Sequence, residues 1–160
     1  MSAGVEAIAA KNAQYKSPRH RARELALQGI YQWRVSGSDA SDIEKHLQGE
    51  KNLGRYDKAM YAKLLRGAIV EHEALETLLA PHLDRALDEL STVEFSVLLL
   101  AAFELSRQLD VPYKVVINEA VELAKTFGGT DGHKYVNGVL DKLAAKLRPD
   151  EVKARKAGAA

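Results

Sequence analysis

The residues best suited to chemistry lie in a glycine-rich stretch, Phe127 to Tyr135 (FGGTDGHKY), between two apolar helical patterns. Gly128 follows the first pattern, where a left-handed residue would end a helix. Thr130 or Asp131 can then cap the next helix by accepting hydrogen bonds from its free backbone amides. The first turn of that helix carries His133, Lys134 and Tyr135, and such a helix start can meet a phosphate and a base together. The same residues also fit an ordinary surface, with Tyr135 half-buried in the core and Lys134 solvated.

A second candidate is the basic run from Lys16 to Arg23 (KSPRHRAR). Ser17-Pro18 predicts a helix start there, so Arg19, Arg21 and Arg23 would lie in the first turns. Positive charge at a helix N-terminus opposes the helix dipole and costs a few tenths of a kcal/mol per residue unless an anion binds. Arginine also stacks on bases and binds phosphate through two donors. The run indicates either an RNA-binding surface or a charge cluster that only solubilises the chain.

Two apolar residues lie off the expected core face of this first helix. That face, at 100° per residue, takes in Ala22 through Trp33 at helical spacing, whereas Leu27 and Tyr31 fall together outside it. They are either scattered surface residues or an anchor for another protein. Glu94 offers a similar choice, because Ser91-Thr92-Val93-Glu94 fits a capping box but the acid could also face a basic partner.

Signatures of catalysis are scarce. The chain has no cysteine, and its 5 histidines form no ligand pair on one helix face. The pair Gly128-Gly129 lacks the lysine and hydroxyl residue of a phosphate-binding P-loop. We therefore expect no catalytic residues, no metal and no cofactor, and a protein that is not an enzyme.

The elements that must position these residues are all helical. Apolar residues recur at three- and four-residue spacing, and no alternating strand pattern of convincing length appears. The sequence predicts an all-α, compact domain of six to seven helices. The expected helices span about 18–35, 42–48, 55–81, 82–90, 92–109, 112–127 and 131–147. Residues 17–148 would form the domain, with a flexible N-terminal extension at 1–16 and a frayed polar tail at 149–160.

Composition sets further bounds. A chain of 160 residues fits one domain, and a net charge of +1 argues against a uniformly basic nucleic-acid binder. The longest apolar run, Phe95 to Phe103, is too short to span a bilayer, and the first residues lack the pattern of a secretory signal. We expect a soluble cytoplasmic protein with no membrane association.

Three stretches together resemble the NusB family of bacterial transcription antitermination factors. They read RHRARELALQGIYQW, LDELSTVEFSVLLLAAFEL and DVPYKVVINEAVELAKTFGGTDGHKYVNGVLDKL, and the resemblance runs from about Ser17 to Arg148. It implies two packed three-helix subbundles. It also implies binding to single-stranded boxA RNA of ribosomal operons together with the ribosomal protein NusE. The resulting RNA polymerase antitermination complex passes terminators without a chemical step by this protein.

The resemblance also implies site residues. The RNA-facing positions correspond here to Arg19, Arg21, Arg23, Lys114, Asp131, His133, Lys134 and Tyr135. Tyr31 and Glu94 match the NusE-facing positions, and the helical-wheel argument adds Leu27 to them. His20 departs from the arginine run of many relatives and attracts phosphate less at neutral pH. If Arg23 and Tyr135 lie side by side in the folded protein, the two RNA-facing segments form one continuous surface.

Two other functions remain open at this point. A similar helical domain accompanies the catalytic part of some ribosomal RNA cytosine methyltransferases, so the chain could be an RNA-binding accessory subunit of such a system. It could also be a helical scaffold whose charges only solvate it. Tyr31 could equally be covered in a homodimer.

Overall fold

The structure is a computed structural model that describes residues 17–159, and these residues contain eight α-helices, two 3-10 helices and no strand. The prediction of an all-α fold is confirmed, with one or two more helices than expected. The chain divides into two compact units, the first ending at Val70 and the second beginning at Glu71. The predicted N-terminal extension, residues 1–16, lies outside the described residues.

The first unit consists of helices α2, α3 and α4. They span Pro18–Ser36, Ala40–Gln48 and Lys58–Val70. The Ser17 hydroxyl accepts from the His20 amide at 3.1 Å, and Gly37 ends α2 with a φ of 76°, as the Ser-Pro and glycine positions predict. Helix α2 packs against α3 and α4. It does so closely at Gly29, where a Cβ atom would lie 2.6 Å from Leu65 Cδ1.

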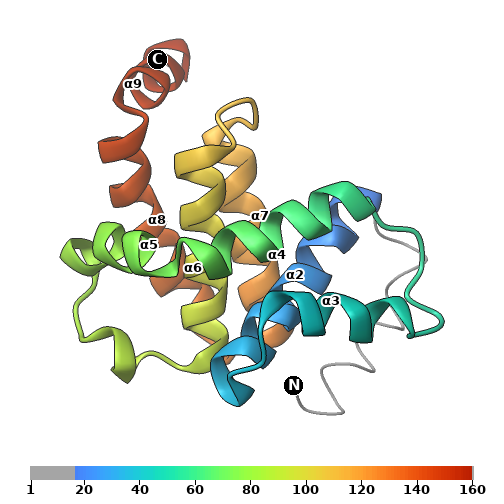
Figure 1. Ribbon diagram of the computed structural model, residues 1–160. Helices are drawn as coiled ribbons and strands as arrows, with labels where there is room; N and C mark the ends of the chain where they lie inside the picture. Colours follow the sequence, from blue (N-terminus) through green and yellow to red (C-terminus); the bar gives the residue numbers. More distant parts are fainter. Residues whose placement is uncertain (1–16, 160) are drawn as a thin grey trace. The chain divides into compact units, whose positions relative to one another are not determined.

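The second unit is built around α6, which is buried along almost its whole circumference from Phe95 to Leu105. Helices α7 and α8 pack against α6 and against each other, and α5 packs against α6 (Figure 1). The α-helices of this unit, α5 to α9, span His72–Leu79, Thr92–Arg107, Tyr113–Phe127, Gly132–Leu147 and Pro149–Ala159. The apolar pattern of α6 had predicted its central place, and the structure confirms it.

Two helix predictions between residues 55 and 90 are wrong. The expected long helix 55–81 begins only at Lys58, capped by the Asp57 carboxylate, which accepts from the Met60 amide at 3.0 Å. It is then interrupted at Glu71, which separates α4 from α5. The expected helix 82–90 is replaced by two short 3-10 helices, η2 (Ala80–His82) and η3 (Leu87–Glu89). Neither 3-10 helix contains a buried residue and Ala86 is exposed, so the buried side that the apolar spacing predicted is not formed by a helix here. Spacing of three or four residues fits 3-10 turns as well as an α-helix, so the pattern could not separate them.

The polar tail also differs from expectation, because residues 149–159 form helix α9 instead of a frayed end. Pro149 fits the first turn of a helix, and Asp150 and Glu151 are placed favourably for the helix dipole. The Glu151 carboxylate accepts from the Tyr113 amide at 2.7 Å, and Val152 is buried. A single buried valine gives no periodic signal, so the sequence pattern missed this helix.

Candidate nucleic-acid interface

The glycine-rich junction joins α7 to α8 inside the second unit. Gly128 follows α7, but its backbone is extended (φ −102°, ψ −173°), so the expected left-handed cap is wrong. Glycine is required there by close approach, because a Cβ would lie 2.7 Å from the Ala124 carbonyl oxygen. Asp131 precedes Gly132, the first residue of α8, yet its side chain forms no cap hydrogen bond. The Asp131 carboxylate instead lies 3.6 Å from the Lys134 ammonium.

Tyr135 lies one turn into α8 and is half-buried. Its hydroxyl oxygen accepts from the Asp84 backbone amide at 3.4 Å, and the Arg85 guanidinium carbon lies 4.4 Å from the ring centroid. Burial raises the pKa of the Tyr135 hydroxyl above its ordinary value. The ring is therefore held by the loop between η2 and η3 and is not a freely rotating surface side chain.

Lys134 is next to Tyr135 along α8, whereas Lys114 lies at the opposite end of the α7–α8 hairpin, beside the residue whose amide donates to Glu151 on α9. The Lys134 side chain is 74% exposed, and His133 and Lys114 are partly exposed, on α8 and on the first turn of α7 respectively. Lys134 is weakly paired with an equally exposed carboxylate, so its charge stays available to an anion.

Glu94 completes the predicted capping box at the start of α6. Its Oε1 accepts from the Ser91 amide at 3.1 Å, and the Ser91 hydroxyl accepts from the Glu94 amide at 3.1 Å. Its Oε2 lies 3.5 Å from the place a Cβ on Gly132 would occupy. The residue predicted to face a protein partner thus adjoins the junction predicted to face RNA.

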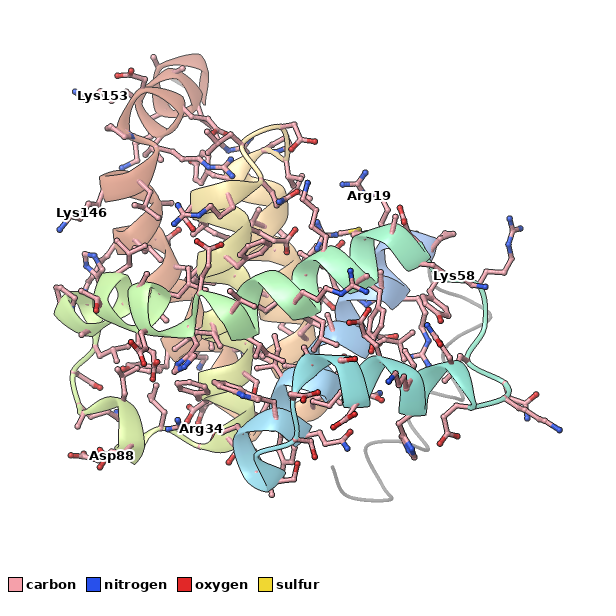
Figure 2. The ribbon with its side chains drawn as sticks, viewed as in Figure 1. Arg19, Arg34, Lys58, Asp88, Lys146 and Lys153 are labelled. Atoms are coloured by element: carbon pink, nitrogen blue, oxygen red, sulfur yellow. The ribbon has the colours of Figure 1, made fainter. Side chains whose placement is uncertain are left out.

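The basic run in the first unit is only partly a surface. Arg19 is exposed, and Figure 2 shows its side chain pointing away from the start of α2. Arg21 and Arg23 are only 1% and 2% exposed. The Arg21 Nε donates to the Leu53 carbonyl at 2.7 Å, and its Nη1 lies 3.2 Å from Glu24 Oε1. In this conformation Arg21 and Arg23 are buried and do not present their charge at the surface, and their part in RNA binding stays a prediction.

The burial of Arg21 has a physical cause in Glu24, which is fully buried. A carboxylate removed from water needs a cationic partner, and Arg21 supplies it one helical turn earlier. His20 contributes as well, because its Nε2 lies 3.7 Å from Glu24 Oε2. The signal in the sequence was the acid three residues after Arg21, which a count of positive charge alone overlooks.

The two apolar candidates on α2 differ in exposure. Leu27 is 1% exposed, so its expected place off the core face is wrong and it offers no surface to a partner. Tyr31 is partly exposed, as an anchor requires. Arg23 belongs to the first unit and Tyr135 to the second, so the hypothesis of one continuous RNA-binding surface stays a prediction.

Sequence analysis missed two residues of this interface, Asp84 and Arg85. They lie in a segment that the sequence predicted to be helical. Neighbouring side chains on a helix point in different directions, so an ion pair between Asp84 and Arg85 was not expected. The structure places them in a loop, where they pair with each other and contact Tyr135. Among residues 17–159, no cluster of three or more acidic or histidine side chains is placed to hold a metal ion. None of the helices in that range is long and apolar enough to cross a membrane.

The fold and the interface define a class: a small protein of two helical units that presents an aromatic ring and cations at a helix junction. The sequence model of the NusB family matches residues 20–145. The chain therefore belongs to the NusB family.

Curated relatives align with this chain along nearly their whole length. The transcription antitermination protein NusB of Burkholderia cenocepacia is 56% identical over 143 residues, which cover 89% of this chain and 99% of that protein. The protein of the same name from Paraburkholderia phymatum is 59% identical over 139 residues, covering 87% of this chain and 96% of that protein.

Solved structures of NusB proteins have a similar fold at lower sequence identity. NusB of T. maritima superposes with a TM-score of 0.72 at 30% identity, covering 86% of this chain and 99% of that one. A crystal structure of the antitermination factors NusB and NusE in complex with double-stranded RNA has a matching chain with a TM-score of 0.69. That chain is 29% identical, and the match covers 79% of this chain and 96% of that one.

Proposed function

We propose that this protein is a transcription antitermination factor that binds boxA RNA of ribosomal operons together with NusE, as part of the RNA polymerase antitermination complex. The observation that carries the proposal is the 56% identity to a NusB protein along 99% of that protein's length. A relative solved with NusE and RNA supports both partners. The protein acts in the cytoplasm and by binding, with no chemical step of its own.

In the second unit, the residues that contact RNA are Lys114, Asp131, His133, Lys134 and Tyr135. In the first unit, Arg19 contacts RNA. Tyr135 stacks on an unpaired base, and the ammonium group of Lys134 attracts a phosphate that flanks this base. Lys114, at the other end of the α7–α8 hairpin, attracts a more distant phosphate of the same strand. Asp131 forms an exposed ion pair with Lys134, with 3.6 Å between the ammonium and the carboxylate. Arg21 and Arg23 support α2 from inside and contribute through its shape.

Tyr31 in the first unit and Glu94 in the second each contact NusE. Tyr31 is an aromatic side chain left partly exposed on α2, and Glu94 supplies a carboxylate for a basic partner. Such aromatic anchors carry much of the binding free energy in interfaces. Residues 17–148 form the domain that carries both surfaces. The alternative, an accessory subunit of a ribosomal RNA methyltransferase, is favoured by no observation on this chain.

The experiment is titration of a fluorescent single-stranded boxA RNA with the protein, alone and with NusE. We expect binding that tightens when NusE is present. Lys134→Ala should weaken it several-fold, whereas Lys153→Ala on α9, also an exposed lysine, should not. Equal affinity for boxA and a scrambled RNA, unaffected by NusE, would contradict the proposal.

Glu94 needs a variant that separates its two roles. Glu94→Gln keeps an oxygen that accepts from the Ser91 amide, so we expect it to cost about 0.5 kcal/mol or less of stability through the helix dipole. Its affinity for NusE should fall several-fold because the charge is lost. Ser91→Ala is the matched control, since it should cost about 1 kcal/mol of stability and leave NusE affinity unchanged. Unchanged NusE affinity in Glu94→Gln would remove Glu94 from the interface.

A further inference from the structure

Asp84 and Arg85 form a fixed pair beside the Tyr135 ring. Arg85 Nε lies 2.6 Å from Asp84 Oδ1, and Nη2 lies 3.1 Å from Oδ2, so the carboxylate holds the guanidinium through two parallel hydrogen bonds. This geometry fixes the plane of the guanidinium as well as its position. The pairing with Arg85 lowers the pKa of the Asp84 carboxyl below its ordinary value, which keeps the pair ionised.

The same pair holds the tyrosine at two points. The Arg85 guanidinium lies over the ring at 4.4 Å, and the Asp84 amide donates to the ring's hydroxyl at 3.4 Å. One contact limits the tilt of the ring and the other limits the position of its far end. Exposed aromatic side chains otherwise lose freedom when a base stacks on them, and prior ordering reduces that loss.

We propose that Arg85, held by Asp84, is a positioning residue of the RNA site that fixes the plane of the Tyr135 ring for stacking on an unpaired base. The proposal rests on the proposed function, and it adds a residue and a mechanism to it. The contact between the guanidinium and the ring is the observation that carries it.

The electrostatics distinguish positioning from direct phosphate binding. The Asp84 carboxylate neutralises Arg85, so the pair brings no net charge to the surface. A phosphate contact by Arg85 would release counterions and contribute about 0.7 to the slope of log affinity against log salt for a single strand. A positioning residue contributes to affinity and leaves that slope unchanged.

The test compares four variants in the boxA titration with NusE present: Arg85→Ala, Arg85→Lys, Tyr135→Leu and the double variant Arg85→Ala/Tyr135→Leu. Arg107→Ala is the control, because Arg107 forms an exposed pair with Glu71 in the same unit, with 2.8 Å between Nη2 and Oε1. Thermal unfolding of each variant shows whether the fold is retained.

We expect Arg85→Ala to weaken RNA binding about three- to fivefold with an unchanged salt slope, whereas Arg107→Ala binds like the parent. Arg85→Lys should be as weak as Arg85→Ala, because an ammonium group has no plane to lie on the ring or to match the carboxylate. In the Tyr135→Leu background, Arg85→Ala should have no further effect, since the ring that it orders is gone.

Other results overturn the positioning role. One such result is an RNA affinity of Arg85→Ala equal to that of the parent. Another is parent-like affinity in Arg85→Lys together with a shallower salt dependence of binding in Arg85→Ala, which would indicate that Arg85 contacts a phosphate. Additive losses in the double variant also contradict it. If Tyr135→Leu weakens binding and Arg85→Ala does not, only this inference fails. If the unaltered protein does not bind boxA RNA, the proposed function fails with it.

Discussion

Arg148 is a buried arginine that holds backbone groups together, in contrast to the exposed Arg19. Its guanidinium is buried and donates to the backbone carbonyls of Glu104, Leu105, Gln108 and Val111, at the end of α6 and in the loop beyond it. The carbonyls of Glu104 and Gln108 also accept from the backbone amides of Gln108 and Val111, whereas Arg148 supplies the donor shown for the carbonyls of Leu105 and Val111. Without Arg148 these last two carbonyls would be buried without a hydrogen bond. The sequence placed Arg148 at the edge of a frayed tail, because its partners are some forty residues away along the chain.

Replacing this arginine should therefore destabilise the protein strongly. We expect Arg148→Met to lower the free energy of unfolding by about 3 kcal/mol, because the buried carbonyls of Leu105 and Val111 lose their donor at once. Urea denaturation followed by circular dichroism measures the change. Arg155→Met on α9 is the matched control and should lie within about 0.5 kcal/mol of the parent, since that side chain is exposed. A loss below 1 kcal/mol in Arg148→Met would mean that water satisfies those carbonyls.

His82 gives a prediction about pH. Burial lowers its pKa below the ordinary value of 6.5, and the nearby ammonium groups of Lys146 and Lys142 lower it further. Figure 2 shows Lys146 extending outward from α8. The unfolded chain then binds a proton that the folded chain resists, between the lowered pKa and 6.5. Stability from this residue is complete above 6.5 and is lost as the pH falls through that window.

We expect His82→Gln to be less sensitive to acidification than the parent between about pH 7.5 and 5.5, because the variant has no proton to take up at this position. Thermal unfolding across that range measures it. Parallel profiles of midpoint against pH for the two proteins would show that His82 is protonated as readily in the folded state as in the unfolded one.

At the scale of elements, the long apolar helices were predictable and the breaks between them were not. The central place of α6, its capping box and the limits of α7 and α8 follow from side-chain spacing within one helix. The interruption at Glu71, the two 3-10 helices and α9 depend on contacts with other elements. The same limit applies to the site: Tyr135 and Lys134 could be proposed from local sequence, but Asp84 and Arg85 are fifty residues away from the ring they contact.

Two helix glycines should respond in opposite ways to the same substitution. A Cβ at Gly29 would lie 2.6 Å from Leu65 Cδ1 and 3.2 Å from Ile43 Cγ2, in the core of the first unit. At Gly138 on α8 a Cβ would meet nothing within 4 Å. Overpacking outweighs the better helix propensity of alanine at Gly29, so we expect Gly29→Ala to lose about 1 kcal/mol and Gly138→Ala to gain about 0.5–1 kcal/mol.

Chemical denaturation of the two variants beside the parent measures both changes. They share one chemical substitution, so a difference in sign isolates the effect of packing from that of propensity. Stabilisation by both would indicate that Leu65 can move aside without cost, and the close approach of α2 to α4 would then be of little energetic consequence.

At the scale of the whole molecule, the distribution of charge matters more than its sum. The chain has 23 basic and 22 acidic side chains, so long-range attraction to RNA is weak and affinity must come from local contacts. Of the cations proposed from the sequence, Arg19, Lys114 and Lys134 are at least partly exposed, whereas Arg21 and Arg23 are buried. The structure therefore leaves three of the five for phosphate contacts.

This count predicts the salt dependence of RNA binding. Three phosphate contacts to a single strand give a slope of about −2 for log affinity against log salt, so binding should weaken about 20-fold between roughly 50 and 200 mM salt. Fluorescence titrations of the boxA complex at several potassium chloride concentrations measure the slope, and Arg19→Ala should make it shallower by about 0.7. A slope of about −3.5 would mean that Arg21 and Arg23 leave their buried positions when RNA binds. Because Glu24 would then lose the cation that accompanies its carboxylate, that result would also require the start of α2 to rearrange in the complex.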